Sequence, residues 1–227
     1  MSRFIARLSA ILLAALGTAG AHAATVEITE WMYNGLGSGS IGEYVEFTNT
    51  GSSSVNMTGW SFDDNSRMPG SQSLSAFGVV APGESVILTD DSAATFRTRW
   101  GLGAGVKIIG GNTNNLGRSD EINLYDASNM LVDRLTYDDQ GSGQVAGPRT
   151  NGVSATILFA NLGSNNASAA VASVNGDIYG SHVDSLSEVG NPGVYTQLSA
   201  VPLPAAAWLL ASGVAALGSF RRRRQSV

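Results

Sequence analysis

The chain offers few side chains that could catalyse a reaction. It has no cysteine and two histidines, and His22 lies close to the N-terminus. The other, His182, stands two residues before Asp184, so one interpretation makes His182 a general base oriented by that carboxylate. The alternative is a loop histidine that faces solvent, because neighbours in sequence do not by themselves form a triad. The shortage of His and Cys ligands also argues against a zinc site.

Acidic residues occur in pairs at predicted strand ends and turns. The pairs are Asp63 with Asp64, Asp90 with Asp91, Asp120 with Glu121, and Asp138 with Asp139. If two of these turns met at one end of a β-sandwich, their oxygens could hold Ca²⁺, which takes six to eight oxygen ligands. The alternative is turn chemistry, because Asp favours Asx turns and helix caps. A glycosidase would need two carboxylates at a set separation, which a sequence does not reveal.

Two aromatic residues are candidates for a ligand surface. Trp31 and Tyr33 precede a Gly/Ser-rich segment at 34–40, where their rings could serve as stacking platforms for carbohydrate. Trp60 follows Gly59 and is expected in the core instead, because large aromatic rings dominate core packing. The sequence thus predicts one possible carbohydrate surface, at Trp31 and Tyr33.

The elements that must position these residues are predicted to be strands. Gly, Ser and Asn recur between short apolar segments, and no long stripe of 3.6-residue period is present, which is typical of an all-β protein. One segment, residues 92–100, is expected to be helical, with Asp91 or Ser92 as its N-cap. Strands are predicted at residues 26–32, 43–47, 60–62, 86–88, 106–109, 121–125 and 130–137, with a tight hairpin turn at 127–129 between the last two. This pattern predicts a β-sandwich.

Several of these segments carry a family pattern. They read GEYVEFTN at 42–49, VNMTGWSF at 55–62, VAPGESVIL at 80–88, LGRSDEINL at 116–124 and LVDRLTY at 131–137. In their order and spacing they resemble the lamin tail domain, an immunoglobulin-like β-sandwich. The resemblance implies that fold, supplies no catalytic set, and implies a binding or interaction module.

The N-terminus has the features of a secretory signal peptide. Arg3 and Arg7 give it a positive start, and the apolar stretch at 8–16 is too short to span a bilayer. A small-residue cleavage signature follows at Ala21, Ala23 and Ala24. We expect a signal peptide over residues 1–24; the alternative is an uncleaved N-terminal helix.

The C-terminus combines a proline pair, an apolar run and a basic stop. The run from Pro204 to Phe220 has 17 residues, about 25 Å of helix, near the short end of a membrane span. Cytoplasmic flanks of membrane helices are rich in Lys and Arg. Here the flank is formed by Arg221, Arg222, Arg223 and Arg224. We therefore expect the bulk of the chain outside the inner membrane.

The same tail resembles the PEP-CTERM sorting signal of exported proteins in Gram-negative bacteria. The motif residues are Val201, Pro202, Leu203, Pro204 and Ala205, with leucine where glutamate is usual. The resemblance implies recognition by an exosortase, which removes the membrane helix, and it implies co-occurrence with exopolysaccharide production. The alternative is a tail anchor that is never processed.

These features divide the chain into a signal peptide (1–24), a lamin-tail-like core (25–140), a C-terminal part with a Gly/Ser/Asn-rich loop (141–200) and a sorting signal (201–227). Within the C-terminal part, the low-complexity segment at 161–172 is expected to form an irregular loop. The region between the two ends has seven basic and 18 acidic residues, a net charge of −11. That charge excludes nucleic acid as a favoured partner, because phosphate binding needs a basic surface.

We therefore expect an exported, non-enzymatic protein of the cell envelope or extracellular matrix, with no cofactor. Its expected partners are the export channel, an exosortase, the inner membrane in passing, and exopolysaccharide or envelope proteins. The alternatives are an adhesion module that binds carbohydrate or calcium, and a secreted hydrolase.

Overall fold

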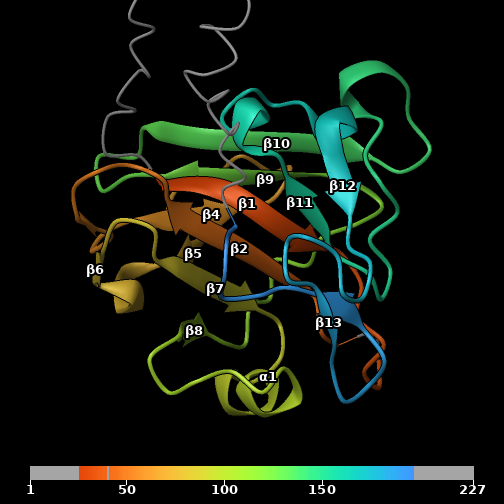
Figure 1. Ribbon diagram of the computed structural model, residues 1–227. Coiled ribbons are helices and arrows are strands. Elements are labelled where there is room, and N and C mark those ends of the chain that lie inside the picture. Colours follow the sequence, from red (N-terminus) through yellow and green to blue (C-terminus); the bar gives the residue numbers. More distant parts are fainter. Residues whose placement is uncertain (1–25, 40, 197–227) are drawn as a thin grey trace, which may run out of the picture.

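The computed structural model describes residues 26–39 and 41–196 (Figure 1). The predicted signal peptide and the predicted sorting signal with its membrane helix lie outside these described residues. Within them, none of the helices is both long and apolar enough for a bilayer crossing.

A six-stranded sheet forms the centre of the described fold. In spatial order its strands are β12 (Ala170–Ala172), β11 (Ala155–Ile157), β1 (Val26–Met32), β2 (Tyr44–Asn49), β7 (Ser85–Thr89) and β8 (Lys107–Ile109). Neighbouring strands are antiparallel, except that β7 and β8 are parallel.

A second sheet of four strands packs against it. Its strands, in order, are β10 (Leu131–Asp138), β9 (Ser119–Tyr125), β4 (Ser61–Asp63) and β5 (Gln72–Ser73). Two short pairs join β3 (Val55–Asn56) to β6 (Val79–Val80) and β13 (His182–Val183) to β14 (Val189–Gly190). The helix α1 (Ala93–Arg99) lies beside β8 (Figure 1). Short 3₁₀ turns occupy Ser75–Phe77, Gly143–Val145, Phe159–Asn161 and Ala167–Ala169.

The main hydrophobic core lies between the two sheets. The six-stranded sheet contributes Val45 and Phe47 from β2, and the four-stranded sheet contributes Ile122 and Leu124 from β9. The partly buried Trp60 packs against this core, as expected for that ring. The predicted β-sandwich is confirmed. Each predicted strand is present, and its ends lie within two residues of the predicted ends.

A β-bulge decides which side chains of β1 enter this core. Ile28 pairs with Phe47 and Glu30 pairs with Glu46, so Thr29 is an extra residue opposite β2. Side chains alternate between the faces of a regular strand, and one extra residue reverses the alternation beyond it. Trp31 therefore joins Ile28 in the core between the sheets.

The opposite face of the six-stranded sheet is also covered. Tyr44 and Ile87 meet Phe96 and Trp100 of the α1 region in a second, smaller core. The Tyr44 and Phe96 rings approach edge to face at 5.3 Å. Ser92 caps α1, as its side chain accepts a hydrogen bond from the Thr95 N–H at 3.1 Å. The helix expected at residues 92–100 and its N-cap are confirmed.

Beyond α1, this face carries two buried carboxylates, and neither forms an ion pair with any residue that the structure describes. Glu30 and Glu46 are cross-strand partners, and neither has exposed surface. Glu30 accepts hydrogen bonds from the Tyr44 hydroxyl at 2.8 Å, from the Ser154 hydroxyl and from the Asn191 N–H at 3.0 Å. Glu46 accepts from the Thr29 hydroxyl at 2.8 Å and from the Gly193 N–H at 2.7 Å. Carboxylates thus fasten residues 191–193 to the sheet.

The chain beyond Gly141 is built into the domain. We expected an irregular loop at 161–172, but it contains a 3₁₀ turn and β12, and β11 and β12 extend the central sheet past β1. The physical reason is that β1 would otherwise leave an unpaired edge, which pairing with β11 covers. The hairpin expected at 127–129 is confirmed, with Asn129 in the left-handed region at φ 61°.

Glu46 makes the stability of the protein depend on pH. Burial, reinforced by the charge of Glu30, raises its pKa from 4.5 to about 8. The folded state then keeps a proton that the unfolded chain loses near pH 4.5. We predict that the stabilisation contributed by this proton is fully present below about pH 4.5 and is lost as pH rises towards 8, by up to about 1.4 kcal/mol per pH unit for each such carboxyl.

Glu46→Gln should reduce this slope, because an amide mimics the protonated acid. Urea unfolding followed by tryptophan fluorescence between pH 5 and 8 measures it, with Glu84→Gln in a surface turn as the control. An unchanged slope in Glu46→Gln would contradict the assignment.

Candidate functional site

His182 and Asp184 do not form a catalytic pair. His182 lies in β13 rather than in a loop, exposed, with Nε2 3.3 Å from the Trp100 carbonyl oxygen. Asp184 Oδ2 accepts from Arg99 Nη2 at 2.8 Å, and its Oδ1 accepts from the N–H groups of Leu186 and Glu188, both at 2.8 Å. Because Asp184 is engaged by these donors, it does not orient the imidazole as a triad requires.

His182 instead borders a groove between the end of α1 and the C-terminal segment. The groove has a volume of about 460 Å³, and Tyr179, Asn191 and Val194 line it with Trp100 and His182. The imidazole stands edge-on to the Trp100 ring at 5.5 Å. The residues that line this groove include no Asp or Glu that could act with the imidazole.

The predicted acidic pairs serve turns and ion pairs. Asp63 accepts from the Met68 N–H at 2.6 Å, and Asp64 from the Ser66 N–H at 2.9 Å. Asp90 accepts from the Gly42 N–H at 2.9 Å. Asp91 and Asp138 cap local turns through the N–H groups of Ser92 and Gln140. Asp139 binds Arg118.

The calcium site proposed for these pairs does not form in the described part of the chain. Across residues 26–39 and 41–196, no three His, Cys, Asp or Glu side chains gather in a way that could hold a metal ion. Most of these side chains accept hydrogen bonds from backbone N–H groups, which is the turn chemistry that Asp residues favour, whereas Asp139 and Glu121 bind Arg118 and Arg67.

The prediction that Trp31 and Tyr33 form a surface platform is wrong. Trp31 has no exposed surface, and Tyr33 is 5% exposed. Both rings pack against Tyr137, with centroids 5.5 and 6.3 Å away. The cause is the bulge at Thr29, which turns Trp31 inward. In a strand of regular alternation counted from Ile28, Trp31 would lie on the opposite face of the sheet. The Tyr33 hydroxyl alone reaches the rim, where it donates to Asp139 at 2.7 Å.

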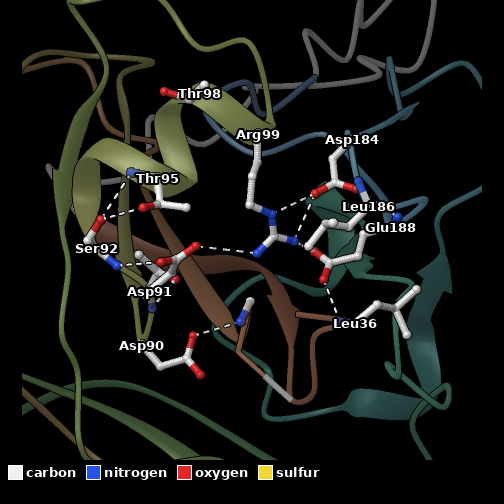
Figure 2. A network of polar contacts seen from close by, with 12 residues as sticks. Leu36, Asp90, Asp91, Ser92, Thr95, Thr98, Arg99, Asp184, Leu186 and Glu188 are labelled. Carbon is white, nitrogen blue, oxygen red and sulfur yellow. Dashed lines mark hydrogen bonds and ion pairs between the residues drawn. The ribbon is translucent and has the colours of Figure 1, made fainter. Parts of the chain in front are cut away.

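The most elaborate polar cluster surrounds Arg99 (Figure 2). Its side chain is 7% exposed, and those of Asp184 and Glu188 have no exposed surface. Arg99 Nη2 lies 2.8 Å from Asp184 Oδ2 and 2.5 Å from Glu188 Oε2, and Nη1 lies 3.4 Å from Asp91 Oδ2. One guanidinium therefore joins α1 to the turn between β13 and β14.

Glu188 extends this cluster to the loop after β1. Its Oε1 accepts from the Leu36 N–H at 2.6 Å (Figure 2). Burial raises the pKa of Glu188, although the Arg99 guanidinium opposes the rise. Gly42, at φ 127°, leaves no space for a side chain, because a Cβ would lie 2.7 Å from Glu188 Oε1. The cluster therefore holds three distant segments together, which is a structural role.

The sequence carries no signal for this cluster. Arg99 and Asp184 are 85 residues apart, and each looks like an ordinary surface charge in its own segment. Glu30 and Glu46 likewise look like the solvent side of two strands. An alternating pattern identifies the face that a side chain occupies, but it does not say whether that face is covered.

The described fold defines a class: a β-sandwich of the immunoglobulin-like kind. The family model that matches the chain is the Lamin Tail Domain, over residues 19–139, more than half of the sequence. The chain belongs to the lamin tail domain family. Its members are non-catalytic modules of structural or interaction function. A search of curated proteins gave no match.

Arg99→Gln should destabilise the protein strongly. It leaves the carboxylates of Asp184 and Glu188 buried without a cation, which typically costs about 3–5 kcal/mol. Urea unfolding at pH 7 measures the loss.

Lys107→Gln is the control. Lys107 pairs with Glu84 at 2.9 Å, and both side chains are partly exposed, at 33% and 26%; such a surface pair contributes about 1 kcal/mol or less. Equal effects of the two substitutions would contradict the structural role of the Arg99 cluster.

Proposed function

We propose that this protein is an exported, non-enzymatic interaction module, sorted by an exosortase to the cell envelope or extracellular matrix of a Gram-negative bacterium. The observation that carries the proposal is the tail at 201–227, which follows a lamin tail domain and combines a Pro-Leu-Pro motif, an apolar run and four arginines. Residues 1–24, with their signal-peptide pattern, are consistent with export.

In the proposed route the signal peptide directs the chain into the export channel. The C-terminal helix then halts in the inner membrane, because Arg221–Arg224 cannot cross a bilayer at low cost. The exosortase engages Pro202, Leu203 and Pro204 and removes the helix. The folded domain is released, or is attached to the envelope, where exopolysaccharide or other envelope proteins are its partners.

A non-catalytic role is supported by the described residues. His182 has no carboxylate partner, and the acidic pairs are engaged by backbone N–H groups and by Arg118. Tight anchoring of the C-terminal segment also suits the proposed processing. Asn191 and Gly193 are fixed to Glu30 and Glu46, so a cut near Val201 would leave the domain intact.

Replacing both Pro202 and Pro204 with alanine should leave an unprocessed, membrane-bound precursor. Intact-mass measurement on membrane and medium fractions from an exosortase-containing host shows directly whether the two ends have been removed. The wild type should lack both ends and be found outside the inner membrane.

Pro69→Ala is the control, because Pro69 lies in an exposed turn far from the tail in sequence. It should be processed like the wild type. Normal trimming of the Pro202/Pro204 double variant, or an untrimmed wild type, would overturn the proposal.

A further inference from the structure

A small polar hollow lies at one end of the sandwich, apart from the groove beside His182. Its volume is about 330 Å³, at the small end of the ~300–1,000 Å³ range of ligand pockets. Five of its seven lining residues are polar: Tyr33, Asn34, Arg118, Arg149 and Asn151. They come from the segments that follow β1, precede β9 and precede β11, so the tertiary fold assembles the hollow from distant parts of the chain.

Arg118 is held rigidly at this hollow by Asp139. Its Nε lies 3.1 and 3.0 Å from the two carboxylate oxygens, and its Nη2 lies 2.9 Å from Oδ1. The Tyr33 hydroxyl donates to Oδ2 at 2.7 Å. The hydrogen bonds from Arg118 keep the pKa of Asp139 below its ordinary value. Both carboxylate oxygens of Asp139 are therefore already engaged, and its role is to position Arg118.

Arg149 is different from the other basic residues of the described part. The other six each have a hydrogen bond or ion pair at 2.9 Å or less. Arg149 is 62% exposed and makes only a distant ion pair, with Nε 4.0 Å from Asp139 Oδ2. Its guanidinium therefore keeps its donors available, and two guanidinium groups share the single carboxylate of Asp139. An arginine fork of this kind suits a carboxylate, which it can bind bidentately.

The amide pair favours a sugar over a peptide. Asn34 Nδ2 donates to Asn151 Oδ1 at 2.9 Å, which leaves the Asn34 oxygen and the Asn151 amide nitrogen to meet hydroxyl groups, each of which donates and accepts. Leu116 is the one aliphatic side chain among the lining residues, and it is 7% exposed. An apolar peptide side chain would therefore find little to contact.

We propose that this hollow binds a carboxylate-bearing sugar unit of an acidic polysaccharide. Arg149 takes the carboxylate, Arg118 supports it, and Asn34 and Asn151 bind hydroxyls. The acidic body of the protein does not forbid this, because charges farther than the Debye length of ~8 Å are largely screened at physiological ionic strength. This inference rests on the proposed function, because it names the class of exopolysaccharide that the exported protein would bind.

The experiment is calorimetric titration of the full-length protein in detergent with oligogalacturonate at 0.15 M salt. The wild type should bind, and the methyl ester of the same oligosaccharide, which lacks the charge, should not. Arg149→Gln should bind at least about tenfold more weakly, because a hydrogen bond to a charged group contributes roughly 1.5–3 kcal/mol. Arg67→Gln removes a charge of similar exposure outside the hollow and should bind like the wild type.

Three results would overturn the inference: no binding of oligogalacturonate by the wild type, equal binding by Arg149→Gln, or equal binding of an oligoglutamate of the same charge. The last would show a carboxylate site that does not select sugars. Intact-mass measurement separates this outcome from the proposed function, because Arg149→Gln should still be exported and trimmed whether or not it binds the sugar.

Discussion

The burial of both faces of the six-stranded sheet is the constraint on which the rest of the structure depends. One face packs against the four-stranded sheet through apolar side chains such as Phe47 and Ile122. The other carries Glu30 and Glu46, which have no exposed surface. Burying a polar group is unfavourable unless it is hydrogen-bonded. The fold must therefore bring donors to that face, and it brings hydroxyls of the sheet and N–H groups of residues 191 and 193.

This requirement explains why the domain does not end where the family match ends, at residue 139. Residues 155–157 and 170–172 pair along the edge of β1, and the segment around 189–193 covers the buried carboxylates. The Arg99 cluster also holds the C-terminal part against the sheet, because it links Asp184 and Glu188 to α1. Without the C-terminal part, Glu30, Glu46 and Arg99 would each lose at least one hydrogen-bond or ion-pair partner.

The same architecture separates stability from recognition. The carboxylates of the covered face and the Arg99 cluster are enclosed and serve the fold, whereas the rim of the sandwich carries exposed basic side chains. Arg149 is the clearest of these, because its neighbour Asp139 is already occupied by Arg118 and Tyr33. In an acidic protein, this pair of arginines at one hollow is the feature that distinguishes one end of the domain from the rest.

The sequence by itself determined the strand segments, the helix with a cap at Asp91 or Ser92, the hairpin turn at 127–129 and the sandwich class, because these depend on local patterns and turn chemistry. It also determined the family, through motifs of fixed order. The tertiary structure decided what no local pattern contains. The bulge at Thr29 turned Trp31 into the core, the C-terminal segment made Glu30 and Glu46 interior, and chain closure joined Tyr33, Arg118 and Arg149 at one hollow. The physical reason is that strand periodicity reports which face a side chain occupies, whereas burial and proximity depend on segments that lie as far as 161 residues away along the chain.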